Sequence, residues 1–211
     1  MRIIIITLAL FSHVALALDL TSLQQRLHAQ QNFSAELSQS KTLNGWNKPL
    51  QASGVMACTQ EHGVLYFLQR PINASYWLQA DQIQVREGSA PLRVMTTAQM
   101  PWLSGITQLF SASVSGDWAR LQQQFNVVMV KSDDRDWRIE LTPLAAPLNA
   151  ALQSVQVSGG SQIEQIVITD KKGDRTQIVL QHHQRIDSAY MNALLQHAGQ
   201  TASVTSSQGL R

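Results

Sequence analysis

The sequence contains a single cysteine, Cys58, so the chain has no internal disulfide to stabilise it. Cys58 also lies far from the N-terminus, which excludes the lipid-attachment cysteine of a lipoprotein. No basic neighbour or helix start is visible beside it to lower the pKa of its thiol. We therefore interpret Cys58 as a small buried apolar residue on a strand rather than as a reactive thiol.

Charged residues are also scarce, at 14% of the chain, and they form no run of one sign. The 16 Lys and Arg residues nearly balance the 14 Asp and Glu residues, for a formal net charge of +2. Such a surface is not typical of a nucleic-acid-binding protein. After the first residues, no segment approaches the ~20 apolar residues that a membrane-spanning helix needs. We expect neither a nucleic-acid partner nor a membrane span.

The chain lacks the short motifs of common catalytic sites: the Gly-x-Ser-x-Gly nucleophile elbow, the phosphate loop and Gly-x-Gly-x-x-Gly. His182, His183, Asp187 and His197 are residues of the kinds that bind metal ions. Adjacent residues of a strand point to opposite faces, however, so His182 and His183 cannot easily bind one ion together. The acidic stretch 133–136 lacks the glycine and the distal glutamate of a calcium loop. We predict a protein that is not an enzyme and that holds no metal or cofactor.

The N-terminus has the pattern of an export signal. Met1 and Arg2 form a short positive segment, and residues 3–11 are apolar. Ala15 and Ala17 then supply the small-x-small pattern that signal peptidase recognises. We expect residues 1–17 to be removed, with cleavage after Ala17, and the mature chain to be exported without a lipid anchor.

Most of the mature chain alternates between apolar and polar residues, which is typical of half-buried strands. Residues 21–30, 101–110, a segment starting near 115 and residues 146–152 have helical spacing instead. The expected strands cover residues 33–38, 53–59, 64–70, 74–79, 82–86, 125–131, 137–141, 155–158, 162–169 and 176–181.

These elements predict one domain over residues 18–200, followed by a frayed tail of Ser, Thr, Gln and Gly over 201–211. No internal repeat or linker divides the chain. The pattern predicts an α+β fold, mainly β, in which a strongly curved antiparallel sheet is covered on one face by the early and middle helices. Such helices enclose either a solid core or a cavity.

Arg70 stands out because it lies within the apolar stretch LYFLQRPINASYWL, directly before Pro71. If the strand over 64–70 is regular, Arg70 shares a face with Tyr66 and Leu68. An inward guanidinium needs acceptors, because an unpaired buried charge is costly. We expect it to donate hydrogen bonds to backbone carbonyls of a covering helix. The alternative is an arginine at the sheet rim that reaches water.

Two segments resemble the LolA family of periplasmic lipoprotein carriers, and more closely its divergent LolA-related branch. One is LQASGVMACTQEHGVLYFLQRP, which ends in Arg70-Pro71. The more specific one is WRIELTPLAAPLNAALQSVQVSGGSQIEQIVITDKKGDRTQIVL, with Leu-Thr-Pro, an apolar helix, a strand and a hairpin. The resemblance covers about residues 20–181.

The resemblance implies an incomplete antiparallel β-barrel whose mouth is closed by lid helices, with Arg70 as a latch that holds the lid shut. It also implies a periplasmic location, a monomer, and a cavity that takes up the acyl chains of lipoprotein or other acylated cargo. An inner-membrane ABC exporter and an outer-membrane acceptor are the implied partners. By strand parity and helical spacing, the candidate cavity residues, each of which is alternatively ordinary core, are Tyr66, Leu68, Trp77, Trp102, Leu103 and Ile106.

A different function on the same scaffold is an envelope sensor or protein-binding module, since envelope-stress regulators also use LolA-like domains. A stable protein partner without lipid cargo would distinguish it from a carrier.

Overall fold

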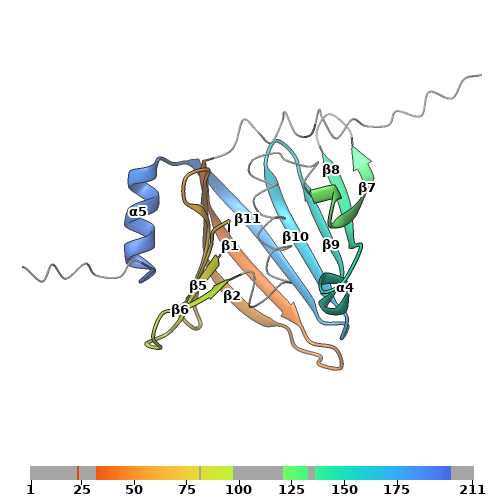
Figure 1. Cartoon of the computed structure of the whole chain (residues 1–211), viewed down its shortest axis with the longest axis horizontal. Helices are drawn as coiled ribbons and strands as arrows, with labels where there is room; N and C mark the ends of the chain where they lie inside the picture. The colour runs from red at the N-terminus through yellow and green to blue at the C-terminus, as the bar shows by residue number, and fades with distance from the viewer. Residues whose placement is uncertain (1–22, 24–31, 81, 97–120, 133–135, 201–211) are drawn as a thin grey trace, which may run out of the picture.

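The computed structural model describes residues 23, 32–80, 82–96, 121–132 and 136–200. Within these residues the chain forms one antiparallel sheet and the helices α4 and α5 (Figure 1). The elements are β1 (Phe33–Thr42), β2 (Leu50–Thr59), β3 (Gly63–Arg70), β4 (Ala74–Leu78), β5 (Gln82–Glu87), β6 (Arg93–Thr96), β7 (Phe125–Ser132), β8 (Trp137–Pro143), α4 (Leu148–Ala151), β9 (Leu152–Gly159), β10 (Ile163–Asp170), β11 (Arg175–Arg185) and α5 (Ser188–His197).

The strand order is β6-β5-β4-β3-β2-β1-β11-β10-β9-β8-β7. β1 therefore pairs with both β2 and β11, so the first and last described strands lie side by side in the middle of the sheet. The sheet is curved and does not close, and β6 and β7 are its edges among the described strands (Figure 1). This confirms the predicted curved, incomplete barrel.

Most predicted strands are confirmed, but the sequence patterns missed β6 and α5. The helix expected over 146–152 is present as the shorter α4. The helices expected over 21–30, over 101–110 and from 115 onward lie outside the described residues, apart from Leu23, Leu121 and Gln122, which are helical. The lid therefore stays a prediction. The signal segment 1–17 and the tail 201–211 lie outside them as well.

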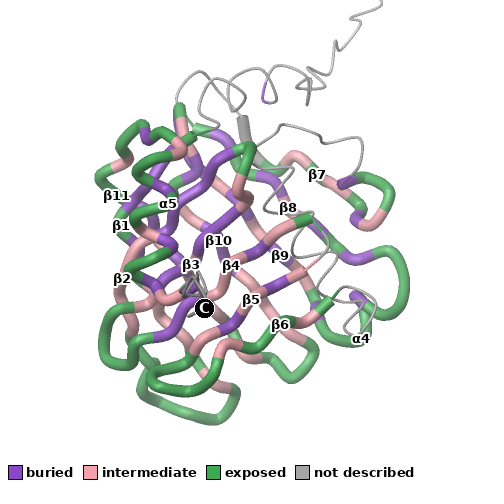
Figure 2. Tube along the Cα trace, turned by 60° about the vertical axis from the view of Figure 1, so that its left-hand side comes forward, coloured by how far each residue is buried: buried purple, intermediate pink, exposed green. Residues whose placement is uncertain are grey.

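The face of the sheet that carries the large apolar cluster is called the inner face here. Alternate residues of β1, Phe33, Ala35 and Leu37, belong to this cluster, as does Cys58 of β2. Figure 2 shows the buried residues gathered along the strands, whereas the hairpin loops are exposed. Burial raises the pKa of the Cys58 thiol, so the interpretation of Cys58 as a buried apolar residue is confirmed.

Helix α5 packs against the opposite, outer face. Its Met191 and Leu195 are one helical turn apart, and they join Leu65 and Phe67 of β3 in a second buried cluster. The strands β2 and β3 are therefore covered on both faces. Because side chains on both faces of β3 are covered, successive residues of this strand are apolar, as in the run Val-Leu-Tyr-Phe-Leu.

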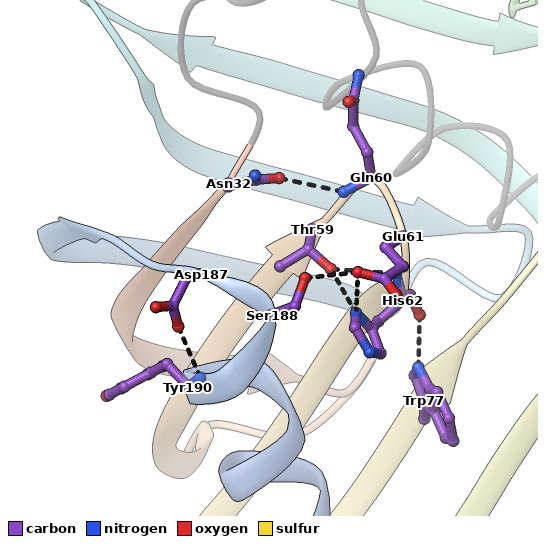
Figure 3. A network of polar contacts seen from close by, with 9 residues as sticks. All are labelled: Asn32, Thr59, Gln60, Glu61, His62, Trp77, Asp187, Ser188 and Tyr190. Atoms are coloured by element: carbon purple, nitrogen blue, oxygen red, sulfur yellow. Dashed lines mark hydrogen bonds and ion pairs between the residues drawn. The ribbon is translucent and has the colours of Figure 1, made fainter.

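Polar contacts fix both ends of α5. At its start, Asp187 accepts a hydrogen bond from the backbone N–H of Tyr190, and the Ser188 hydroxyl donates to Glu61 in the β2–β3 turn (Figure 3). At its end, the buried Ser75 hydroxyl of β4 donates to the carbonyl oxygen of Ala198 over 2.9 Å. The helix is thereby attached to the back of the strands whose inner face is described below.

A β-bulge interrupts β3 beside Arg70. Ser53 pairs with Arg70 and Gly54 pairs with Leu68, so Gln69 is an extra residue with no partner on β2. The bulge reverses the side-chain alternation, and Arg70 lies on the face of Ser53 rather than on that of Leu68. Arg70 is exposed. The prediction of an inward, buried Arg70 is therefore wrong, because it assumed a regular strand.

The bulge depends on a glycine. A Cβ atom at Gly54 would lie 1.9 Å from the carbonyl oxygen of Phe67, a distance that only a backbone shift could relieve. We predict that Gly54→Ala lowers the free energy of unfolding by about 2–4 kcal/mol, measured by urea denaturation. The neighbouring Ser53→Ala is the control and should change it by less than about 1 kcal/mol. Equal stability of the two variants would contradict this account of the bulge.

Candidate functional site

An apolar groove of about 740 Å³ lies at the end of the sheet where the β1–β2 hairpin meets the β3–β4 turn. Its volume is within the range of ~300–1,000 Å³ that is typical of ligand pockets. The described residues that line it are Pro49, Leu50, Gln51, Ala52, Leu68, Pro71, Ile72, Ala74, Tyr76 and Glu87.

Several of the lining side chains are apolar and yet face solvent. Leu50 is 51% exposed and Ile72 is 68% exposed. Each of them follows a proline, Pro49 or Pro71, at the point where a turn meets a strand. Large exposed apolar residues that converge on one groove indicate a surface that binds another apolar group. Neither residue was predicted from the sequence, although an apolar residue after a turn proline is a usable signal.

Two tyrosines stand beside the groove on the inner face. The rings of Tyr66 and Tyr76 pack edge to face with their centroids 6.2 Å apart. The Tyr66 hydroxyl donates to the side-chain oxygen of Gln39 on β1 over 2.5 Å, and the Tyr76 hydroxyl donates to Glu87 over 3.3 Å. The aromatic rings thus supply apolar surface, and their polar ends are bonded to neighbouring strands.

The environment of the tyrosines disfavours their ionised forms. Burial, and to a lesser extent the neighbouring Tyr76, raises the pKa of Tyr66 above its ordinary value. Burial also raises the pKa of Tyr76, and the negative charge of Glu87 adds to that shift. Both side chains are therefore neutral hydrogen-bond donors at physiological pH.

The structure brings together only part of the predicted cavity set. Leu68 lines the groove, and Tyr66 lies beside it on the same face. Trp77 does not join them, because it pairs with Leu65 and packs on the outer face with α5, where its indole N–H donates to the carbonyl oxygen of His62 over 2.6 Å. The expectation that Trp77 shares a cavity with Leu68 is wrong.

The other predicted site residues are not tested. Trp102, Leu103 and Ile106 lie outside the described residues. Among the described residues, Arg70 makes no side-chain hydrogen bond or ion pair. Most of each helix that it was expected to hold, over 21–30, over 101–110 and from 115 onward, lies outside the described residues. Its role as a latch stays a prediction.

The titratable side chains near α5 do not form a hydrolase triad. The Ser188 hydroxyl donates to Glu61, not to an imidazole, and Nδ1 of His62 lies 3.1 Å from the Thr59 hydroxyl (Figure 3). The partner of Ser188 is therefore a carboxylate, which differs from the Ser-His pair of a hydrolase triad.

The two adjacent histidines have separate partners. Nδ1 of His182 lies 3.0 Å from Glu36, and Nε2 of His183 lies 2.9 Å from the carbonyl oxygen of Ile163. Within the described ranges, no group of His, Cys, Asp and Glu side chains has the arrangement of a metal site. Across the same ranges no helix is both long and apolar enough to cross a membrane.

The family model described as outer membrane lipoprotein carrier protein LolA-like matches residues 12–200. The chain belongs to the LolA-like family. No curated protein matches the sequence at a significant level. The resemblance seen in the sequence is thus confirmed, and a lipoprotein-carrier or related binding function is supported at the level of the family.

Several solved structures are similar to this LolA-like chain. A LolA superfamily protein from Nitrosomonas europaea has 12% identity and a TM-score of 0.46, over 81% of this chain and 95% of that one. A DUF1329 family protein from Desulfovibrio piger has 13% identity and a TM-score of 0.44, over 82% and 94%. The MucA/MucB complex of Pseudomonas aeruginosa has 12% identity and a TM-score of 0.37, over 82% and 58%. These scores are too low to indicate a shared function.

The tyrosine pair gives a prediction for stability at alkaline pH. The pKa of Tyr66 is higher in the folded chain than its unfolded value of about 10. As the pH rises, the unfolded chain therefore loses the hydroxyl proton at a lower pH than the folded chain does, which favours unfolding. The contribution is complete below pH ~10 and is lost as the pH rises beyond it. We expect Tyr66→Phe to lessen the fall in unfolding free energy above pH ~10, measured by urea denaturation at a series of pH values. Identical slopes for both proteins would contradict this assignment.

Proposed function

We propose that this LolA-like protein is a periplasmic carrier that binds the acyl chain of a lipoprotein, or of another acylated molecule, in the groove and takes it toward the outer membrane. The observation that carries the proposal is the groove itself, with an apolar lining that includes the exposed side chains of Leu50 and Ile72. The family description supports the class of cargo.

The energetics of an acyl chain suit such a carrier. Transfer of about 16 methylenes from water at about 0.8 kcal/mol each would contribute about 13 kcal/mol. Association costs of ~4 kcal/mol or more reduce this gain. The remainder is enough to keep an acyl chain out of water, but it also makes spontaneous release slow.

A carrier with such a cargo needs partners for loading and release. A partner that binds one conformation of the carrier better than another can shift its population toward release. An inner-membrane ABC exporter for loading and an outer-membrane acceptor for release are the partners that we propose, with the carrier acting as a monomer.

Charged substitutions on the rim of the groove test the proposal. We predict that Leu50→Glu and Ile72→Glu each weaken binding of Nile red at least about tenfold, because each places a carboxylate where the apolar probe would lie. Both side chains are more than half exposed, so the folded structure should persist. Fluorescence titration of detergent-free protein measures the affinity, and displacement by a palmitoylated peptide shows that acyl chains use the same site.

Val128→Glu and Val130→Glu are the matched controls. These valines are 48% and 52% exposed and lie on β7 at the opposite edge of the sheet. They should retain wild-type affinity. Failure of the wild-type protein to take up either ligand, or equal loss in all four variants, would overturn the proposal. A stable protein partner recovered without lipid would favour the protein-binding module instead.

A further inference from the structure

The groove has one charged side chain among the described residues that line it. Glu87 is the last residue of β5 and pairs with Ala74, which also lines the groove, so its carboxylate lies beside an otherwise largely apolar surface. A carboxylate at the end of an apolar groove has the position that would meet the polar end of a bound amphiphile.

Two neighbours hold this carboxylate in place. Oε2 of Glu87 accepts a hydrogen bond from the Arg93 guanidinium over 2.8 Å, and Oε1 accepts one from the Tyr76 hydroxyl over 3.3 Å. A carboxylate has about four acceptor sites, so these bonds leave acceptor sites free. The Glu87 side chain is also 48% exposed, so a ligand can reach it.

None of the nearby basic side chains is among the described residues that line the groove. Arg93 is bonded to Glu87 and is not among the lining residues, and Arg86 points to the outer face, where it donates to the carbonyl oxygen of Gly199 over 2.6 Å. Lys48 and Arg70 each precede a lining proline without lining the groove, and the register places Arg70 on the outer face. The charge that faces the groove is negative.

We propose that Glu87 is a specificity-determining residue, and that the groove prefers a single-chain amphiphile whose polar end is a primary ammonium over one whose polar end is a carboxylate. This inference rests on the proposed function, since it concerns the same groove. An ammonium donates hydrogen bonds to Glu87 and attracts its charge, whereas a carboxylate offers no donor and is repelled by it.

Competition among three ligands with the same alkyl chain tests this preference. Dodecylammonium, dodecanol and dodecanoate, each kept below its micelle concentration, displace the neutral probe Nile red from the full mature chain. We expect dodecylammonium to bind about five- to tenfold more tightly than dodecanoate, with dodecanol between them.

Three variants locate the effect. Glu87→Gln keeps the shape of the side chain and should abolish the preference, so that dodecylammonium and dodecanoate bind with equal affinity. Arg93→Gln frees the carboxylate from its ion pair and should increase the preference. Glu164→Gln, at an exposed carboxylate on β10, is the control and should retain the wild-type order of affinities.

The outcomes separate the two proposals. If none of the three ligands and no Nile red binds the wild-type protein, the proposed function fails and this inference fails with it. If all three bind with equal affinity, if dodecanoate binds most tightly, or if Glu87→Gln keeps the preference, only the role of Glu87 is overturned. Circular dichroism of each variant confirms that it is folded.

Discussion

The inner face of this sheet carries a large apolar cluster, and the sheet does not close on itself. Because β1 pairs with both β2 and β11, strands from the two halves of the chain contribute to one buried cluster. An open curved sheet of this kind must cover its inner face with other material. Where the β1–β2 hairpin and the β3–β4 turn meet, the described side chains leave a groove instead of a filled core. The candidate function depends on that unfilled end.

Helix α5 supports the strands of the groove from the outer face. Helix α5 buries Leu65 and Phe67 on the back of β3, while the Ser75 hydroxyl bonds to the end of the same helix. The strands under the groove are therefore held by packing from behind as well as by their own hydrogen bonds. The Glu87 carboxylate lies beside the apolar rim of the groove, where Arg93 and the Tyr76 hydroxyl donate hydrogen bonds to it.

The sequence predicted the strands well, because period-two alternation such as that of Phe33, Ala35 and Leu37 directly reflects a sheet with one buried face. It failed where alternation alone does not determine the face. The extra residue Gln69 turns Arg70 outward, and no local pattern announces a bulge. Trp77 lies on the outer face because it pairs with Leu65, whose side chain points away from the face of Leu68. Helix α5 was missed although Asp187 is a typical N-cap and Met191 and Leu195 have helical spacing. The groove was only partly foreseen, since its rim is formed by loop residues.

Photoaffinity labelling would test the proposal that an acyl chain lies in this groove. A palmitoyl analogue with a photoreactive diazirine at the end of its chain would be bound, irradiated and located by mass spectrometry of peptides. The account predicts labelling of residues 49–52 and 68–76, which form most of the groove's lining. Labelling confined to α5 and the outer face, or no labelling above that of unfolded protein, would contradict it.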